Sequence, residues 1–119
     1  MKVIIAGGRD FNDYSMLKEA CDWALSKLTD IEIVSGCAKG ADSLGERYAS
    51  EAGHPCKLFP ADWEKYGRAA GYKRNAEMAK YANCLIAFWD GTSKGTQHMI
   101  NLAKNNGLSI KIINYEKKK

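Results

Sequence analysis

Three short segments combine glycine with hydroxyl and basic residues, a composition suited to holding a phosphate group. The segment WDGTSKGT, residues 89–96, follows the apolar run 84–88, and the segments AGGRDF, residues 6–11, and SGCAKGAD, residues 35–42, follow two other apolar runs. Six of the eleven glycines lie in these segments, more than turns alone require. Glycine lets backbone N–H groups approach a ligand closely, and the amides of a following helix N-terminus attract anions. We therefore expect a phosphate or a nucleotide to bind there.

Side chains in the same segments strengthen this expectation. They would add hydroxyl donors and positive charge: Thr92, Ser93, Thr96, Arg9 and Lys94. Each segment taken singly is also consistent with a simple turn, and SGCAKGAD has neither the Walker A spacing nor the dinucleotide fingerprint. The prediction depends on all three segments meeting at one edge of a sheet.

Residues 60–71, PADWEKYGRAAG, form the one long irregular connection that the pattern predicts, and such loops in compact domains are usually functional. Aromatic and basic side chains alternate in it and just beyond it: Trp63, Lys65, Tyr66, Arg68, Tyr72, Lys73 and Arg74. An aromatic ring there would stack on a base while the cations face phosphates. The alternative is a lid whose own aromatic side chains pack over the core.

Four side chains are candidates for catalysis: Asp62, Glu64, Asp90 and His98. The first two would bond ribose hydroxyls or transfer protons. Asp90, at the end of the apolar run 84–88, would do the same or cap the turn. His98 falls in the first turn of the last predicted helix, close to the expected anion site, and a structural role is its alternative.

Alternating apolar and helical patterns predict the elements that position these residues. Strands are predicted at 3–6, 31–34, 56–59, 84–88 and 109–113, and helices at 17–28 after an N-cap at Asn12 or Asp13, at 40–52 before Gly53, at 70–82 and at 95–106. Such alternation favours parallel strands joined by right-handed crossovers. We predict a Rossmann-like three-layer α/β sandwich of about five parallel strands with helices on both faces. If the strand order is 3-2-1-4-5, the first and fourth strands are neighbours at the switch point, where ligands bind.

Length and charge indicate one domain with little affinity for polyanions. The 119 residues allow a single nucleotide-binding domain, predicted at 1–114, followed by a basic tail at 115–119. The formal net charge is +4, and three of these charges are the lysines at 117–119. A nucleic-acid-binding protein usually shows a basic face rather than a basic tail, so the composition argues against a nucleic-acid partner.

The cysteines and the apolar runs indicate a cytoplasmic protein. The four cysteines form no CxxC or Cys/His pair, and all lie in or beside apolar segments, which predicts buried free thiols in a reducing compartment. We expect neither a metal site nor a cofactor. The apolar run near the start is too short for a signal-peptide core, and no run reaches membrane-spanning length.

Four blocks in chain order, IIAGGRDF, IVSGCAKGADSLGERYA, FPADWEKYGRAAGYKRNAEMA and LIAFWDGTSKGTQHMI, resemble the SLOG superfamily (SMF/DprA and LOG), in particular its small stand-alone YspA/YpsA-related branch. The resemblance spans roughly residues 3 to 113, with Cys37 where a GGARGAD-like block usually has glycine. It implies a Rossmann-like fold, a nucleotide-derived ligand, a homodimer or higher oligomer, and links to bacterial defence and phage genomes. It also implies ligand contacts at Gly7, Gly8, Arg9, Ser35, Gly36, Asp42, Arg74, Asn75, Asp90, Gly91, Ser93, Lys94, Gly95 and Thr96.

One difference from the enzymes of this superfamily bears on mechanism. The LOG branch, which hydrolyses the N-glycosidic bond of nucleoside monophosphates, resembles GGxGTxxE, and here Met99 stands at the position of that glutamate. A methionine cannot stabilise an oxocarbenium-like centre or carry a proton. The catalytic arginine of the branch has a counterpart in Arg74.

Three functions follow from these observations. The leading hypothesis is a binding protein that senses or sequesters a nucleotide-derived small molecule of the ADP-ribose or cyclic-nucleotide type. The second is a LOG-like nucleotide phosphoribohydrolase or phosphodiesterase. The third is single-stranded DNA binding through the basic and aromatic residues at 65–74, which the near-neutral body of the chain disfavours.

Overall fold

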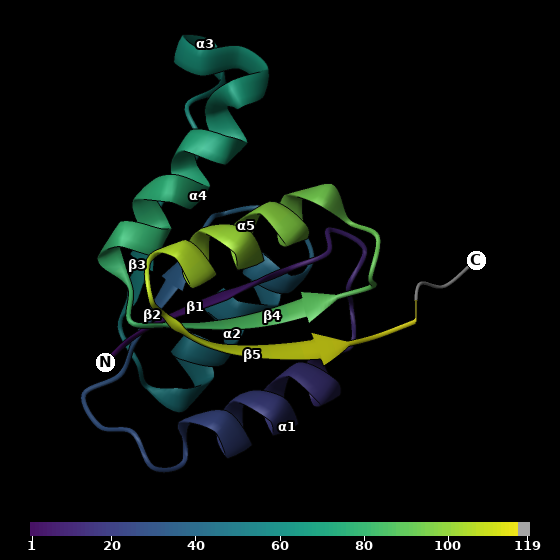
Figure 1. Ribbon diagram of the computed structural model, residues 1–119. Coiled ribbons are helices and arrows are strands. Elements are labelled where there is room, and N and C mark those ends of the chain that lie inside the picture. The colour runs from purple at the N-terminus through teal and green to yellow at the C-terminus, as the bar shows by residue number, and fades with distance from the viewer. Residues whose placement is uncertain (117–119) are drawn as a thin grey trace.

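A computed structural model describes residues 1–116 and shows a five-stranded parallel sheet (Figure 1). The strands are β1 (Lys2–Gly7), β2 (Glu32–Ser35), β3 (Cys56–Leu58), β4 (Cys84–Trp89) and β5 (Ser109–Asn114). All neighbouring strands pair in parallel, which confirms the predicted fold, and their order is β3-β2-β1-β4-β5, the order in which β1 and β4 are neighbours. The predicted tail at 115–119 falls mostly at 117–119, outside the described residues.

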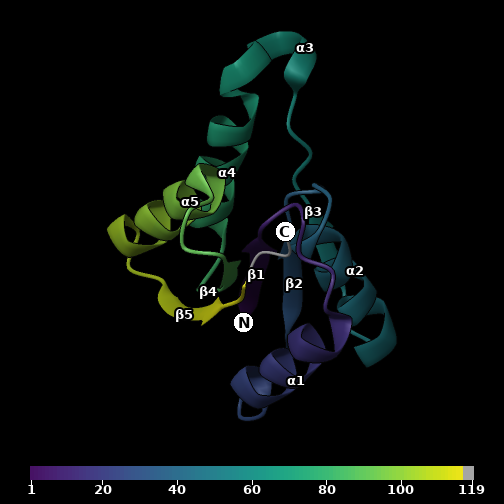
Figure 2. The same cartoon turned by 90° about the vertical axis from the view of Figure 1, so that its right-hand side faces the viewer.

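Helices cover both faces of the sheet, as expected for parallel strands joined by crossovers. They are α1 (Tyr14–Leu25), α2 (Ala41–Ala52), α3 (Trp63–Tyr66), the 3-10 turn η1 (Gly67–Ala69), α4 (Ala70–Tyr81) and α5 (Lys94–Asn105). Figure 2 shows α1 and α2 on one side and α4 and α5 on the other. The predicted caps hold: the Asp13 side chain accepts from the Met16 amide at 3.0 Å, and Gly53 ends α2 in the left-handed conformation.

Two apolar clusters, one on each face, hold the layers together. Ile5, Leu17 and Phe88 belong to the cluster beneath α1 and α2, and Ile4 and Met99 to the cluster beneath α4 and α5. The central strands β1 and β4 are buried over most of their length, whereas the edge strands β3 and β5 are largely exposed. Burying one such aliphatic or aromatic side chain contributes about 1.5–3 kcal/mol, so this core fixes the sheet and its loops.

The segment predicted as an irregular connection at 60–71 is helical from Trp63 onward. The Asp62 side chain accepts from the Lys65 amide at 3.0 Å and starts α3, which leads through η1 into α4. We call residues 62–72 the arm, because they stand away from the sheet in both views (Figures 1 and 2). Trp63 is 52% exposed and Tyr72 50%, so the arm is not a lid packed by its aromatic rings over the core.

The thiols correct a second expectation. The four cysteines are free within the described chain, but only Cys21 is buried, while Cys37 and Cys56 are exposed and Cys84 is intermediate. Cys56 begins the edge strand β3, and Cys37 lies in the loop after β2, where neither has a covering layer. Among residues 1–116, no helix combines the length and apolar character needed to cross a membrane.

Candidate functional site

A cleft of about 520 Å³ opens at the carboxyl ends of β1 and β4, where the predicted switch point lies. Ten of the predicted ligand-binding residues line it: Gly7, Gly8, Arg9, Asp42, Arg74, Asn75, Asp90, Ser93, Gly95 and Thr96. The lining also includes Asp10, Ala38, Met78, Thr92 and Met99. Six predicted residues lie outside it: Ser35, Gly36, Trp63, Tyr66, Gly91 and Lys94. The fold thus brings residues from four separate segments to one place.

We expected the backbone amides after β1 and β4 to face a ligand, but several of them are bonded within the protein. The Gly8 amide donates to the Phe88 carbonyl at 3.1 Å, so it holds β1 to β4 instead of facing a ligand. The amides of Thr92 and Ser93 both donate to Oδ1 of Asp90 at 2.8 Å. Asp90 therefore organises the loop after β4, which is the capping role that the sequence analysis kept as an alternative.

The backbone amides that remain available to a ligand belong to the N-terminus of α5. Its first intrahelical bond runs from the Gln97 amide to the Ser93 carbonyl at 3.1 Å, so the amides of Lys94, Gly95 and Thr96 have no partner within the helix. Gly95 and Thr96 line the cleft, and the positive end of the helix dipole points the same way. The hydroxyls of Ser93 and Thr96, 3.2 Å apart, lie beside these amides. This terminus is suited to an anion.

The glycines fall into two groups. A Cβ on Gly7 would lie 2.3 Å from the Phe88 carbonyl oxygen, and one on Gly8 1.8 Å from the Tyr115 hydroxyl. Gly36 and Gly40 are crowded in the same way by side chain or backbone atoms. These glycines are needed for the chain to pack against itself. At Gly95, by contrast, the added carbon would have no atom of the described residues within 4 Å apart from its chain neighbours and the adjacent backbone of α5.

Arg74 and Asp42 form the charged wall of the cleft. Asp42, at the start of α2, is 5% exposed and accepts from the Ala38 amide at 3.2 Å. Burial raises the pKa of this carboxyl to about 6, against the opposing effects of the Ala38 amide and Arg74. Arg74 donates from Nη1 to the Gly36 carbonyl, and burial lowers its pKa while Asp42 opposes that change. Arg9, on the loop after β1, is near enough to act on both groups.

The candidate catalytic side chains do not gather around one point. Asp62 and Glu64 lie on the arm, where Asp62 caps α3. Asp90 lines the cleft but holds its own loop, and His98 contacts Asn75 and the ring of Tyr72 beside the cleft. Trp63 packs toward Gly71 on the arm.

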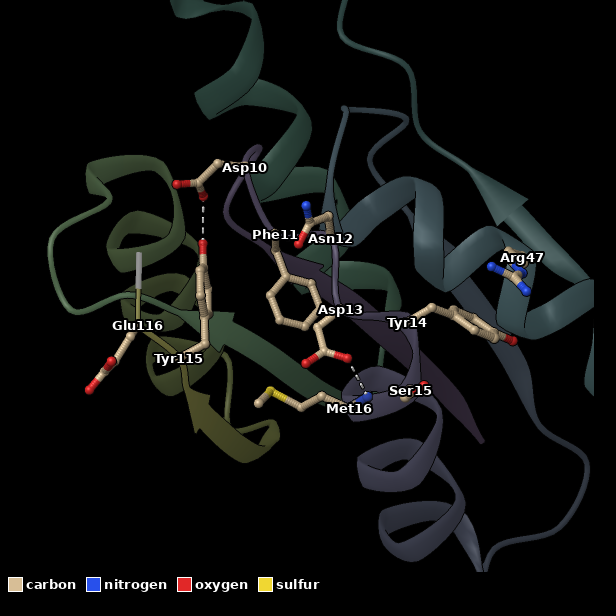
Figure 3. A pocket seen from close by; sticks show the side chains of 10 residues that line it. All are labelled: Asp10, Phe11, Asn12, Asp13, Tyr14, Ser15, Met16, Arg47, Tyr115 and Glu116. Carbon is tan, nitrogen blue, oxygen red and sulfur yellow. Dashed lines mark hydrogen bonds between the residues drawn. The ribbon is translucent and has the colours of Figure 1, made fainter. Parts of the chain in front are cut away.

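Sequence reasoning missed the contact between the end of the chain and the loop after β1. Tyr115, predicted to lie in the tail, donates its hydroxyl proton to Oδ1 of Asp10 at 2.7 Å, and its ring meets Phe11 edge-on at 4.8 Å (Figure 3). Asp10 separates the cleft from a second hollow of about 560 Å³. No local pattern marks Tyr115, because its partner is distant in the sequence.

Comparison with known proteins identifies the class to which this Rossmann-like protein belongs. Residues 1–66 match the family described as YspA, cpYpsA-related SLOG family. The chain belongs to this family. It is also similar to the "Gene 61 protein" of Mycobacterium phage D29, with 34% identity over 116 residues that cover 92% of this chain and 93% of the phage protein. The phage protein thus matches α4, β4 and α5 as well, which complete the cleft.

Proposed function

We propose that the protein binds a nucleotide-derived small molecule, with a phosphate at the N-terminus of α5, and acts as a sensor or sequestering protein. Gly95 carries the proposal. Glycine near a helix start weakens the helix relative to alanine, and no side chain or distant backbone of the described residues occupies the space that its missing side chain leaves. The absence of a side chain at this position lets a ligand atom approach the exposed amides.

The rest of the cleft suits the same ligand. Its volume of about 520 Å³ lies within the range of small-molecule sites, and Arg9 and Arg74 would balance the charge of a phosphate or pyrophosphate. Asp42 and Asn75 offer partners for hydroxyl groups such as those of a ribose. An ADP-ribose-type molecule or a cyclic nucleotide combines these features.

Met99 favours binding without LOG-like hydrolysis. Its side chain is buried and lines the cleft. The LOG enzymes that the sequence resembles have a glutamate at this position. A thioether neither transfers a proton nor stabilises positive charge at an anomeric carbon. We expect a bound nucleotide to leave the protein unchanged.

Calorimetry with AMP, ADP-ribose and cyclic mononucleotides and dinucleotides tests the proposal. We expect at least one dissociation constant below about 1 mM, the weak end of specific small-molecule binding. Chromatography of the same mixtures after long incubation should recover each nucleotide intact. The absence of binding to the whole panel would contradict the proposal.

One observation favours hydrolysis as a second candidate function. Asp42 is a buried carboxyl in the cleft whose pKa of about 6 suits proton transfer near neutrality. A phosphoribohydrolase or phosphodiesterase would release base or phosphate. In that case Asp42→Asn would retain binding and lose turnover.

A further inference from the structure

A line of polar side chains runs from α5 through α4 to the loop after β2. Nδ1 of His98 lies 3.3 Å from Nδ2 of Asn75, and Oδ1 of Asn75 accepts from Nε of Arg74 at 3.0 Å. Arg74 in turn donates to the Gly36 carbonyl. Asn75 is 8% exposed, so water does not readily replace its partners. The line connects His98, outside the cleft lining, to Arg74, which forms part of it.

The protonation state of His98 follows from the chemistry of its neighbours. An arginine only donates hydrogen bonds, so the Asn75 atom that faces Arg74 is the amide oxygen. The NH₂ group of the amide then faces His98, and Nδ1 of the imidazole must accept. The contacts therefore require a neutral His98 with its proton on Nε2.

We infer that neutral His98 positions Arg74 in the cleft through Asn75, and that protonation of His98 releases Arg74. A proton on Nδ1 would set an N–H group against the NH₂ group of Asn75. If the amide turned over to avoid this, its NH₂ group would face Nε of Arg74. Both arrangements oppose two donors and lose a hydrogen bond at a buried side chain. His98 is thus a positioning residue that acts through Asn75.

The groups that surround His98 favour its neutral form. From α4, the ring of Tyr72 packs edge-on against the imidazole with 4.5 Å between centroids, and Arg74 stands behind Asn75. On its own helix, Lys94 precedes it by one turn. Burial lowers the pKa of His98, and no carboxylate within residues 1–116 opposes this effect.

The consequence for affinity rests on the proposed function, because Arg74 affects binding only if the cleft takes an anion. Affinity should rise with pH as His98 loses its proton, by about fivefold for one hydrogen bond. Asp42, whose pKa is about 6, acts in the opposite direction as it ionises and repels an anion. The two effects must therefore be separated by a variant.

His98→Asn supplies that variant. The Oδ1 atom of an asparagine takes nearly the place of the imidazole Nδ1 and accepts a hydrogen bond at every pH. It therefore keeps the line of contacts intact, while Asp42 still titrates. Asn75→Ala breaks the line at its centre, and thermal melts show whether either variant folds.

Nitrogen NMR of the unliganded protein tests the positioning directly. We expect the His98 signals of the Nε2–H tautomer. We also expect the Nε–H of Arg74 to be protected from exchange relative to its intrinsic rate at each pH, and this protection should fall as His98 is protonated. Asn75→Ala should make that exchange fast at every pH, and His98→Asn should keep it slow. A proton on Nδ1 of neutral His98, or Arg74 exchange indifferent to both variants, would overturn the inference.

Binding of ADP-ribose between about pH 5.5 and pH 8 tests the consequence, since its pyrophosphate does not titrate in this range. The ratio of wild-type to His98→Asn affinity should rise about fivefold with pH. A constant ratio would contradict the link from His98 to affinity. If neither protein binds ADP-ribose while the NMR result holds, this ligand for the proposed site is wrong and the positioning role stands.

Discussion

The loop after β1 and the loop after β4 lie side by side, are both rich in glycine, and differ in what their glycines do. Gly7 and Gly8 are in contact with Phe88 and Tyr115, and the Gly8 amide is bonded across the sheet. Gly95 faces open space beside amides that have no partner within the helix. The first loop therefore serves the fold, and the second is available to a ligand. Glycine is thus needed for packing in the loop after β1, and it leaves room for a ligand in the loop after β4.

Gly40→Ala should give the largest effect among the packing glycines. The residue has φ of +75°, and a Cβ would lie 2.2 Å from the Gly8 carbonyl oxygen. We expect a loss of about 3 kcal/mol in the free energy of unfolding, from backbone strain together with overpacking, measured by urea titration. Gly67→Ala is the control, because Gly67 has φ of +53° and ψ of −132°, close to the +75° and −126° of Gly40, but lies in open space and should cost only the strain. Equal losses in the two variants would show that packing around Gly40 is unimportant.

Asp42→Asn should stabilise the protein in a pH-dependent way. The pKa of Asp42 is raised from 3.8 to about 6 on folding, so the folded state binds the proton more tightly than the unfolded state. Stability from this group is complete below about pH 4 and is lost as pH rises through about 6. The variant should therefore gain about 3 kcal/mol near pH 8 and nothing near pH 4. Chemical unfolding at both pH values checks this, and a gain that does not change with pH would refute it.

Gly95→Ala tests the loop that is available to a ligand. Beyond its chain neighbours and the adjacent backbone of α5, the added methyl group meets no atom of the described chain, so the free energy of unfolding should stay the same or rise slightly. Affinity for the nucleotide found by calorimetry should fall about tenfold, because the methyl group occupies the approach to the helix amides. Asn101→Ala, on an exposed position of α5, is the control. Unchanged affinity would remove the main support for the proposed site.

Tyr115→Phe should give the smallest effect and refine the view of the first loop. The change removes the hydrogen bond to Asp10 and leaves the ring on Phe11. We expect a loss of about 1 kcal/mol in the free energy of unfolding. Thermal melts measure it, and amide exchange at residues 8–11 should quicken if Tyr115 holds this loop. A variant that matches the wild type in both measurements would show that the contact is incidental.

Most of the fold and part of the candidate site could be predicted from local pattern. The apolar runs placed all five strands to within about two residues, and Asp13 and Gly53 marked helix ends because capping is a local interaction. The helical turns of the arm at 63–69 were missed, since these short turns have weak periodicity and begin from a single cap at Asp62. The exposure of Cys37 and Cys56 was missed because an apolar neighbourhood in sequence does not reveal the edge of a sheet.

The sequence by itself determined the alternating elements, the parallel sheet that crossovers favour, and the edge at which polar loops gather, because these follow from periodicity and chain connectivity. The order of the strands in the sheet came from the tertiary structure. Only the tertiary structure decided which glycine is crowded and which amide is already bonded. It also decided that Arg74, Asn75 and His98 form one line of contacts. The reason is physical: a partner for Gly7, Gly8 or Arg74 comes from segments distant in the chain, and packing alone selects it.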